Sequence, residues 1–485
     1  MQHIREQGAG KEKAANRWGI LAVLVMCPFM ATIDSSIVNV ALPVLTSSLG
    51  VSAADIAWVV SSYLIAISAS ILFLGRLGDI IGHIRVLQYG MVVFGIGSLL
   101  CGLSHSFILL VLSRIVQAIG AAGMMANNQG IITRVFPGTQ RGRALGINAA
   151  FVALGTLVGP AVGGLILTFA TWEYLFWINV PICIAVVIVG HILYPKEEET
   201  VREKVDIPGT ALFALAITAL FIGLGQAQTL GLTHPLVFIS LPLAVILFAW
   251  FLRVQTTSAS PLLRLDIFRS KWFSVSIFCA FCSYVAISCS NLVLPFYLQD
   301  LLRFTPGTAG LYLTVYPLVV ALIAPLSGYL SDKVGSEALT LMGLILTSVG
   351  LFLLSTLGAQ PAHMNLILYI AIMAAGNGMF QSPNNSIVMA AVPKGQVGVG
   401  GSVNALVRNL GFTFGIALST SLLYGGMSAR LGTRVTGYVP GQDGAFIYGM
   451  RLAYLGAAGV CLLGAIITLF RLYGKRERGS RSTAR

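Results

Sequence analysis

The sequence consists of successive blocks of about 20 or more apolar residues, separated by short charged or Gly-, Pro- and Ser-rich links. A helix rises about 1.5 Å per residue, so a block of this length crosses a hydrocarbon layer roughly 30 Å thick. Only 10% of the 485 residues are charged, whereas soluble domains usually carry about 25%. So much apolar surface cannot be hidden inside a soluble globule, and the pattern predicts an all-α integral membrane protein.

Fourteen membrane spans are predicted from these blocks. Six spans come first, two more follow a charged stretch, and six complete the chain. Their ranges are 18–45, 54–77, 84–104, 107–132, 143–170, 174–194, 207–228, 235–254, 272–299, 307–330, 338–358, 363–391, 396–425 and 446–471. The predicted 6 + 2 + 6 architecture comprises a tail (1–17), an N-terminal six-helix bundle (18–195), a charged linker with two additional helices (196–271), a C-terminal six-helix bundle (272–471) and a basic tail (472–485).

The basic residues are divided unequally between the two sides of this arrangement. Of the 30 Lys and Arg residues, 24 fall in the two tails and in the links on the same side. Because basic links stay in the cytoplasm, both termini are predicted to be cytoplasmic in a multi-pass protein of the cell membrane. The net charge of +13 then reflects topology and contact with anionic lipids, and no binding of nucleic acid is expected.

An internal repeat relates the two halves of the chain. The segment GRLGDIIG at 75–82 recurs as GYLSDKVG at 328–335, 253 positions later. A second pair, FPGTQRGRALG at 136–146 and VPKGQVGVG at 392–400, has its prolines 256 positions apart. Two independent motifs therefore agree on the offset to within three residues. Duplicated halves around a central cavity are typical of transporters.

Two glycine motifs are candidates for gating. The repeated loop motif is predicted to act as a latch between helix bundles, because its glycines allow close approach and Asp79 can face the N-terminus of a neighbouring helix; a charged tight turn would explain a single copy. The segment GTLVGPAVGG at 155–164 lines one helix face with glycines and holds a proline, so its residues leave a hinge and a packing face equally open. The candidate gating residues are Gly75, Asp79, Gly82, Arg85, Gly155, Gly159, Pro160, Gly163, Gly164, Gly328, Asp332 and Gly335.

Asp34 is the one acid predicted to lie deep inside a span, and Arg114 is one of two such arginines. Charges at this depth are costly and need a partner. At about 1.5 Å per residue, Asp34 lies about 24 Å from Trp18 at one face, and Arg114 about 10 Å from Phe107 at the other. Across a core of roughly 30 Å these depths nearly coincide. We expect the two residues to meet, either as a purely structural ion pair or as the site of proton coupling.

Amide and aromatic side chains are frequent in the predicted spans, above all in the second half. Some of the amides are expected simply to join helices. The others, with the aromatic rings, are expected to line a wide amphiphilic cavity for apolar molecules that carry a polar group. The candidate cavity residues are Asn39, Tyr63, Gln117, Asn127, Asn148, Phe151, Tyr284, Asn291, Tyr316, Asn377, Phe380, Gln381, Asn404 and Arg408.

Together these motifs resemble the major facilitator superfamily, and more closely its fourteen-span drug:proton antiporter branch, the EmrB/QacA type. The segment IDSSIVNVALP at 33–43 is similar to the first-span motif of that branch, and 75–85 to the superfamily's loop motif. Arg114 with Gly120 looks like the fourth-span motif, and 155–164 like the fifth-span antiporter motif, which is associated with export. The resemblance implies the major facilitator fold and favours the hinge interpretation of 155–164.

The chain departs from the family pattern in two ways. In the loop motif, Ile80, His83 and Ile84 stand where the family usually has basic residues, so the latch is expected to be weaker. The second half also lacks the further acids that exporters of cations often bear. Cationic drugs are therefore not expected to be the main substrates.

The sequence thus predicts a secondary exporter that exchanges protons for amphiphilic drugs or toxic organic compounds by alternating access, with Asp34 as proton carrier. Its expected partners are protons, amphiphilic small molecules and membrane lipids, and a periplasmic adaptor protein is left open. The alternative is an exporter or uniporter of a small metabolite with the same fold and no proton coupling.

Other classes fit the sequence less well. An ATP-driven pump would need a separate ATPase subunit, because the chain has no Gly-x-x-x-x-Gly-Lys-Ser/Thr phosphate loop. A membrane enzyme would need clustered catalytic groups, and Asp34 stands alone among acids. The seven cysteines all lie in apolar segments, where they are expected to be small buried side chains rather than disulfides or metal ligands. No cofactor is predicted.

Overall fold

The computed structural model describes residues 2–51, 53–194, 205–230, 234–258, 260–393, 396–435 and 437–483. The charged stretch at 196–204 and the extreme ends of both predicted tails lie outside them. The helices are α1 (Gln2–Leu49), α2 (Ala53–Ile81), α3 (His83–Gly102), α4 (Phe107–Val135), α5 (Gly138–Phe169), α6 (Tyr174–Trp177), α7 (Asn179–Leu193), α8 (Ile207–Leu230), α9 (Pro235–Thr257), η1 (Leu265–Arg269), α10 (Lys271–Phe296), η2 (Tyr297–Leu301), α11 (Pro306–Val334), α12 (Ser336–Ser355), α13 (His363–Ala391), α14 (Val397–Leu431) and α15 (Asp443–Thr483).

Fourteen helical segments of the described chain are long and apolar enough to cross a membrane, as the sequence predicted. The sixth of these segments is divided, because α6 ends at Trp177 and α7 begins at Asn179. The ninth joins α10 to the π-helical turn η2. All seven cysteines are buried, as expected for small side chains in apolar segments.

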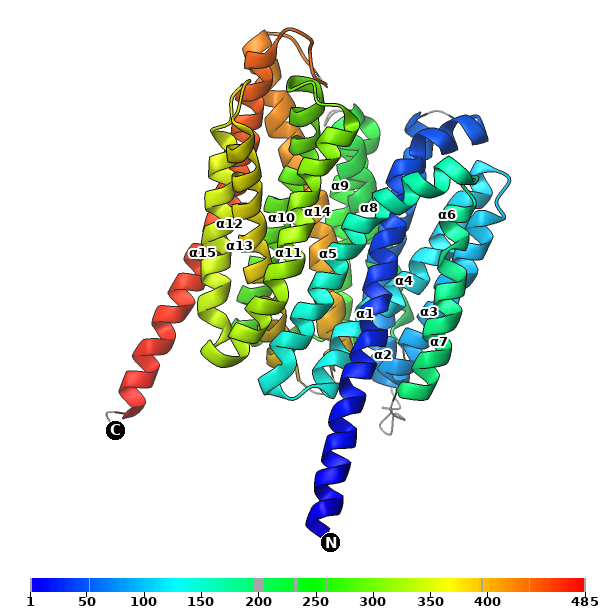
Figure 1. Ribbon diagram of the computed structural model, residues 1–485, viewed down its shortest axis with the longest axis vertical. Coiled ribbons are helices and arrows are strands. Elements are labelled where there is room, and N and C mark those ends of the chain that lie inside the picture. Colours follow the sequence, from blue (N-terminus) through cyan, green and yellow to red (C-terminus); the bar gives the residue numbers. More distant parts are fainter. Residues whose placement is uncertain are drawn as a thin grey trace.

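Figure 1 shows the spanning helices standing side by side with both termini at the lower end, which we call the terminal side. In the first bundle α1 packs against α5 and α3 against α4, and in the second α10 packs against α14 and α12 against α13. The bundles meet along two seams, one between α5 and α11 and the other between α2 and α14. Helices α8 and α9 pack against each other, and α8 also contacts both α2 and α14, so it covers the second seam.

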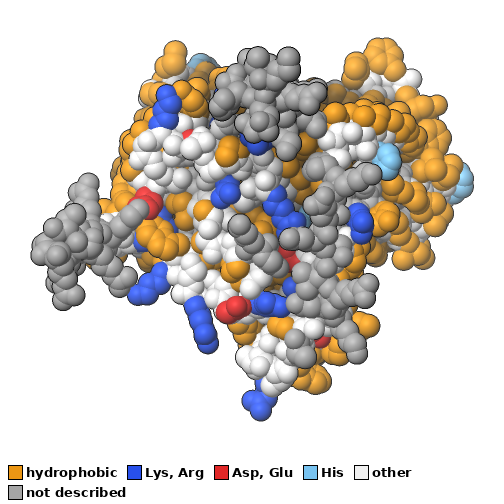
Figure 2. All heavy atoms as spheres, turned by 90° about the horizontal axis from the view of Figure 1, so that it is seen from below, with side chains coloured by type: hydrophobic (Ala, Val, Ile, Leu, Met, Phe, Trp, Pro, Cys, Tyr) orange, Lys and Arg blue, Asp and Glu red, His pale blue; other side chains and the backbone are white. Residues whose placement is uncertain are grey.

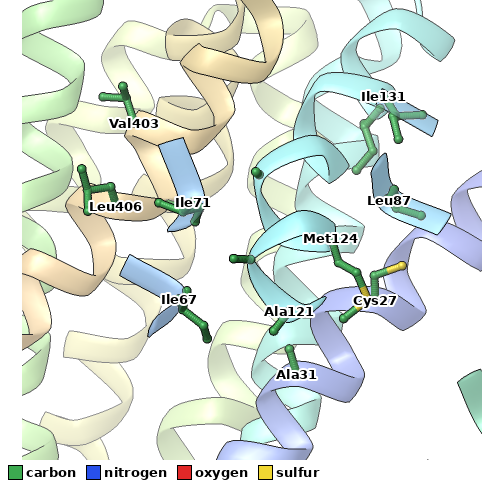
Figure 3. Packing of buried hydrophobic residues seen from close by; sticks show 14 of the residues in the cluster. Cys27, Ala31, Ile67, Ile71, Leu87, Ala121, Met124, Ile131, Val403 and Leu406 are labelled. Carbon is green, nitrogen blue, oxygen red and sulfur yellow. The ribbon is translucent and has the colours of Figure 1, made fainter. Parts of the chain in front are cut away.

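The largest apolar cluster fixes the seam between α2 and α14. Figure 3 shows Ile67 and Ile71 of α2 beside Val403 and Leu406 of α14. Phe213 of α8 belongs to the same cluster. Each of these five residues is at most 8% exposed, so the cluster holds both bundles and seats α8 on them.

Glycines at equivalent positions let helix pairs approach closely in both bundles. In the first bundle, a Cβ on Gly120 of α4 would lie 2.6 Å from the Gly90 carbonyl oxygen of α3. In the second, a Cβ on Gly376 of α13 would lie 2.8 Å from the Gly343 carbonyl oxygen of α12. Gly343 follows Gly90 by 253 positions and Gly376 follows Gly120 by 256, which are the two offsets of the sequence repeat. Residues at these offsets therefore occupy comparable places in the two bundles.

Two glycines make the tight turns of the repeated loop motif. Gly82 has φ of 109° and separates α2 from α3, and Gly335 has φ of 98° and separates α11 from α12. Residues with a side chain rarely adopt such angles. Since α1 starts on the terminal side and α2 returns to it, the first of these turns lies on that side.

Candidate functional site

Asp34 of α1 and Arg114 of α4 form an ion pair inside the first bundle. Arg114 Nη1 lies 2.6 Å from Asp34 Oδ2. Each residue is 1% exposed, so water does little to screen their attraction. The depth estimate from the sequence predicted this encounter, and the structure confirms it.

Two amides donate hydrogen bonds to the other oxygen of this carboxylate. Gln117 Nε2 of α4 donates to Asp34 Oδ1 at 2.8 Å, and Asn179 Nδ2 of α7 donates to the same oxygen at 2.9 Å. Gln117 Nε2 also lies 2.8 Å from Ser98 Oγ of α3, to which it donates. Three donors thus satisfy a carboxylate that has lost its water.

Arg114 has two further acceptors and an aromatic ring beside it. Its Nε donates to the Val59 carbonyl oxygen of α2 at 3.3 Å, and its Nη1 donates to Gln117 Oε1 at 2.5 Å. The ring of Tyr63 lies 4.0 Å from Arg114 Cζ, a cation–π contact. These three contacts do not involve Asp34. If Asp34 became neutral, they would still compensate the charge of the guanidinium.

The second bundle has no ion pair at the equivalent place. At the offset of 256 positions, Arg114 corresponds to Ile370 and Gln117 to Met373. Both belong to the apolar core of the second bundle. No acid occurs between residues 284 and 292, where the counterpart of Asp34 falls. The ion pair is therefore a feature of the first bundle alone.

The glycine motif of α5 packs against the segment of α1 that carries Asp34. A Cβ on Gly155 would collide with Thr32 Oγ1, and a Cβ on Gly159 would collide with Ser36 Oγ. Ser36 Oγ also donates to the Gly155 carbonyl oxygen at 3.3 Å. Asp34 lies between these two contacts along α1, so its position is tied to that of α5.

The rest of this motif packs less tightly. A Cβ on Gly163 would lie 3.5 Å from Ile37, and nothing lies within 4 Å of one on Gly164. Pro160 lies inside α5 on its exposed side. The close contact with α1 therefore depends on the first two glycines, and a hinge at the proline stays a prediction.

The loop motif of each bundle holds the start of a helix in the other bundle. Asp79, near the end of α2, accepts from the backbone N–H of Gly398 in α14 at 2.9 Å and from the next N–H at 3.2 Å. Asp332, near the end of α11, accepts from the backbone N–H of Gly142 in α5 at 2.9 Å and from the next at 3.0 Å. Carboxylates are favourable near helix N-termini, where the helix dipole is positive. Gly398 lies in the first turn of α14, whose N–H groups have no partner within the helix, and Gly142 lies in the second turn of α5. We call these two contacts the latch.

Glycines on both sides make the latch possible. A Cβ on Gly75 would lie 2.6 Å from the Gly398 carbonyl oxygen, and one on Gly142 would lie 2.6 Å from the Gly328 carbonyl oxygen. Gly328 follows Gly75 by 253 positions, and Gly398 follows Gly142 by 256. The two seams are therefore closed by copies of one contact.

His83, one of the departures from the family pattern for which the sequence predicts a weaker latch, lies beside Asp79 of the latch. It is fully buried, and its Nδ1 is 2.8 Å from Asn127 Oδ1 of α4. Its Nε2 is 3.3 Å from Asp79 Oδ1. Asn127, which the sequence placed in the cavity, instead anchors this histidine and donates to the Leu74 carbonyl oxygen at 3.2 Å.

Figure 2 shows the terminal side of the molecule, on which Lys and Arg side chains outnumber Asp and Glu. Arg85 of the loop motif is exposed, and its Nη1 donates to the Ile81 carbonyl oxygen at 3.3 Å. Described basic side chains are thus present on the face where the sequence predicts them.

Polar side chains of the second bundle form a chain across α10, α11 and α13. Tyr316 OH donates to Asn377 Oδ1 at 3.1 Å, and Asn377 Nδ2 donates to Ser283 Oγ at 3.3 Å. Gln381 Nε2 donates to Tyr284 OH at 3.2 Å. Tyr316 and Gln381 are half-buried, so these two cavity candidates are the accessible members of the group.

A second polar group joins the two bundles. Asn404 Nδ2 of α14 donates to Gln129 Oε1 of α4 at 2.9 Å and to Asn385 Oδ1 of α13 at 2.8 Å. Within the first bundle, Asn128 Nδ2 donates to Asn148 Oδ1 at 3.1 Å. Asn148 corresponds to Asn404 at the offset of 256 positions, so both bundles place an amide here.

The other cavity candidates differ in accessibility. Asn39 and Asn291 are exposed. Phe151 is half-buried, with its ring centroid 5.9 Å from that of Phe29 in an edge-on contact. Phe380 is 2% exposed and packs in the core of the second bundle. Like Tyr63, Gln117 and Asn127, it is buried against protein rather than presented to a partly open space.

Arg408 of α14 is the second arginine inside a span, and it is half-buried. Its Nη2 lies 3.9 Å from Met125 Sδ of α4, and a thioether is a weak acceptor. Within the described residues, Arg408 forms no ion pair.

Sequence reasoning missed Asn179 and Ser98, which complete the surroundings of Asp34. A signal was present for the first: Asn179 is a lone amide in the apolar segment FWINVP. Ser98 gave none, because serines are common in packed membrane helices.

Comparison with known proteins identifies the family. Residues 24–280 and 276–485 each match the sequence profile of the Major Facilitator Superfamily. The chain is 34% identical over 459 residues to the riboflavin transporter RibZ of Clostridioides difficile, which covers 94% of this chain and 97% of RibZ. It is 28% identical over 414 residues to the multidrug resistance protein Stp of Mycobacterium tuberculosis, covering 85% of this chain and 77% of Stp.

Solved structures share the fold at much lower identity. The crystal structure of the human organic anion transporter MFSD10 has a TM-score of 0.68 at 14% identity, and the match covers 93% of this chain and 99% of MFSD10. Other relatives are named as a lincomycin resistance protein and a tetracenomycin C resistance and export protein. With its fourteen spans, this chain is a transporter and not an enzyme, and it belongs to the fourteen-span drug-efflux branch of the Major Facilitator Superfamily.

Proposed function

We propose that the protein is a secondary exporter that exchanges a proton for an amphiphilic organic compound by alternating access, with Asp34 as the proton carrier. The observation that carries this proposal is the ion pair: Asp34 is 1% exposed inside a span and lies 2.6 Å from Arg114. A carboxylate is expensive at this depth. Protonation cancels its charge, so the same group can be stable in two states.

The proton acts on the contact between α1 and α4. A proton on Asp34 competes with Arg114 for the carboxylate and removes their attraction. Arg114 keeps the Val59 carbonyl oxygen and Gln117 Oε1 as acceptors. Helix α1 can then shift, and its close packing on Gly155 and Gly159 carries the shift to α5. Because α5 forms one of the seams, the proton state biases which side of the transporter is closed.

The terminal side is proposed to face the cytoplasm. Lys and Arg gather on this face (Figure 2), as cytoplasmic faces of membrane proteins do. The latch closes both seams there, which supports a conformation that is closed toward the cytoplasm and exchanges proton and substrate with the outside.

The driving force limits what one proton can move. At about 2.3 kcal/mol per charge per 100 mV and about 1.4 kcal/mol per pH unit, a gradient of about 100 mV and half a pH unit supplies roughly 3 kcal/mol. This concentrates a neutral compound on the order of a hundredfold. A monovalent cation exchanged for one proton moves no net charge and gains only the pH part. A single coupling carboxylate therefore suits neutral or zwitterionic substrates.

Proton release from the purified protein tests this proposal. Substrate binding favours the ionised carboxylate, so an amphiphilic drug should release protons into a weakly buffered solution. We expect release from the native protein and from Ser48→Ala, a change at an exposed position of the same helix, and none from Asp34→Asn, which should still bind the drug. Binding without release in the native protein would remove Asp34 from proton coupling.

A second candidate is transport of a small metabolite without proton coupling, which the 34% identity to a riboflavin transporter over 94% of the chain favours. The ion pair would then be structural. Riboflavin counterflow in proteoliposomes decides between the two: a rate that neither a protonophore nor Asp34→Asn changes supports uncoupled transport, and no riboflavin counterflow rules riboflavin out as the metabolite.

A further inference from the structure

We propose that Arg408 binds an anionic group of the transported compound, so that the substrates are amphiphilic organic anions or zwitterions. This inference rests on the proposed export function and names its substrate class. It starts from the one deep charge that the ion pair of the first bundle does not explain.

The groups around Arg408 are neutral. Its neighbour on α4 is Met125, at 3.9 Å. One turn away on α14, Asn404 bonds to Gln129 of α4 and Asn385 of α13. These contacts place a thioether beside Arg408 and amides one turn closer to the terminal side, rather than a carboxylate.

The next turn of α14 carries Phe412, whose ring centroid lies 5.5 Å from that of Tyr284 on α10. Tyr284 OH accepts from Gln381 Nε2 of α13 at 3.2 Å. Positions four apart lie on one helix face. Along that face of α14, Arg408 therefore lies between the amide of Asn404, one turn earlier, and the ring of Phe412, one turn later. Helices α4, α10 and α13 all contribute neutral groups.

The contrast with Arg114 shows what Arg408 lacks. Arg114 has a carboxylate and two further oxygen acceptors, whereas Arg408 has a sulfur. A charge inside a span without a partner is costly and marks a functional position. The repeat also shows that the fold does not need a cation here, because the residue 256 positions earlier on α5 is Val152.

Arg408 lies where α14 becomes accessible. Every residue from Val397 to Leu406 is buried, and residues 407–410 are half-buried. At about 1.5 Å per residue, Arg408 is about 16 Å from the start of the helix, which is near the middle of a layer of roughly 30 Å. The guanidinium is thus the first accessible charge on this helix beyond the latch.

The chemistry of the site fits a carboxylate or similar anion on an aromatic body. A guanidinium presents two parallel N–H donors that match a carboxylate. Tyr284 and Gln381 add a hydroxyl and an amide beside Phe412, one turn along α14, and Phe412 and Met125 offer apolar contact to the body of the molecule. A cationic compound would meet repulsion at the same place.

Export of an anion also suits a single coupling carboxylate. A membrane potential that is negative inside drives each negative charge outward, by roughly fiftyfold in concentration per charge at about 100 mV. When one proton enters as one monoanion leaves, two charges move in the favourable direction. The membrane potential, which does not drive the exchange of a monovalent cation for one proton, therefore drives the export of a monoanion with two charges.

The test compares two probes that differ only in charge: a fluorescent naphthalene sulfonamide with a free carboxylate and its primary amide. Binding to the purified protein is measured by fluorescence titration. We expect Arg408→Gln to weaken carboxylate binding by roughly ten- to a hundredfold, the effect of losing a charge-assisted hydrogen bond, and to change amide binding less than about twofold. Arg430→Gln is the matched control on the same helix, since Arg430 lies far from this site over the Tyr448 ring, and it should change neither.

Several results would overturn the inference: a native protein that prefers the amide or binds neither probe, or an Arg408→Gln variant that loses both probes equally or keeps both. If Arg408→Gln does not fold, Arg408→Lys decides, because it keeps the charge without the two-pronged donor and should weaken only the carboxylate. Proton release is measured on the same preparations. If Arg408→Gln weakens only carboxylate binding but the native protein releases no protons, proton exchange is refuted and the role of Arg408 stands. If the native protein releases protons but Arg408→Gln does not distinguish the two probes, only the role of Arg408 is refuted.

Discussion

Single residues differ in how the bundle compensates their charge. Asp34 receives hydrogen bonds from Arg114, Gln117 and Asn179, so its ionised form is fully satisfied without water. Breaking such a buried pair by removing one partner leaves an uncompensated charge, which costs far more than the pair gains. The two charges of Asp34 and Arg114 are therefore stable together, whereas either charge alone would destabilise the fold.

Arg114→Met tests this asymmetry. At alkaline pH, where the carboxyl cannot relieve the loss by taking up a proton, it leaves Asp34 charged and buried without its cation, and we expect it to lower the free energy of unfolding by about 3–5 kcal/mol. The double variant Asp34→Asn/Arg114→Met removes both charges and should recover most of that loss. Thermal unfolding in detergent measures both, and an Arg114→Met protein that melts at the native temperature would contradict the account.

The residues around this pair show where sequence reasoning stops. Depth along a helix follows from counting residues, so the encounter of Asp34 with Arg114 was predictable. The helix face on which a side chain lies depends on packing, which counting does not give. The sequence therefore predicts a cavity for Tyr63 and Gln117, whereas both lie beside the ion pair, and it does not single out Asn179, which contacts Asp34.

At the scale of helices, the repeat explains why both seams close in the same way. The pairs Gly75 with Gly398 and Gly142 with Gly328 are related by offsets of 253 and 256 positions. The repeated motif was visible in the sequence. Its partners were not, because nothing in the sequence states that α2 meets α14 and α5 meets α11.

A methyl group at the α5 seam should open the latch. Gly142→Ala places a Cβ 2.6 Å from the Gly328 carbonyl oxygen, whereas a Cβ on Gly138 of the same helix has nothing within 4 Å. We expect Gly142→Ala to destabilise the closed seam by about 1–3 kcal/mol, as overpacking does. Distances between spin labels on Thr139 and Val334, both exposed, should lengthen in this variant and stay unchanged in Gly138→Ala. Equal distance distributions in the two variants would show that the seam tolerates the methyl group.

At the scale of the whole molecule, the number of spans and the overall fold were predictable because apolar length is a local property that a membrane selects directly. The placement of α8 was not. Its buried Phe213 seats it over the seam of α2 and α14, whereas within the described residues neither α8 nor α9 packs extensively on α5 or α11. In the alternating movement that we propose, we expect α8 to move with the seam of α2 and α14.

The direction of transport depends on which way this molecule faces, and exposed positions on its two ends test it. Thr139 lies near the start of α5 on the terminal side, and Ala359 lies in the turn between α12 and α13 at the other end; both are exposed. The native cysteines are all buried and should react slowly with a membrane-impermeant maleimide. In intact cells we expect Ala359→Cys to be labelled and Thr139→Cys to be labelled only after permeabilisation. The reverse result would place the latch on the outer side of the membrane. The structure would then be closed to the outside and open to the cytoplasm, and Asp34 would have to exchange its proton with the cytoplasm.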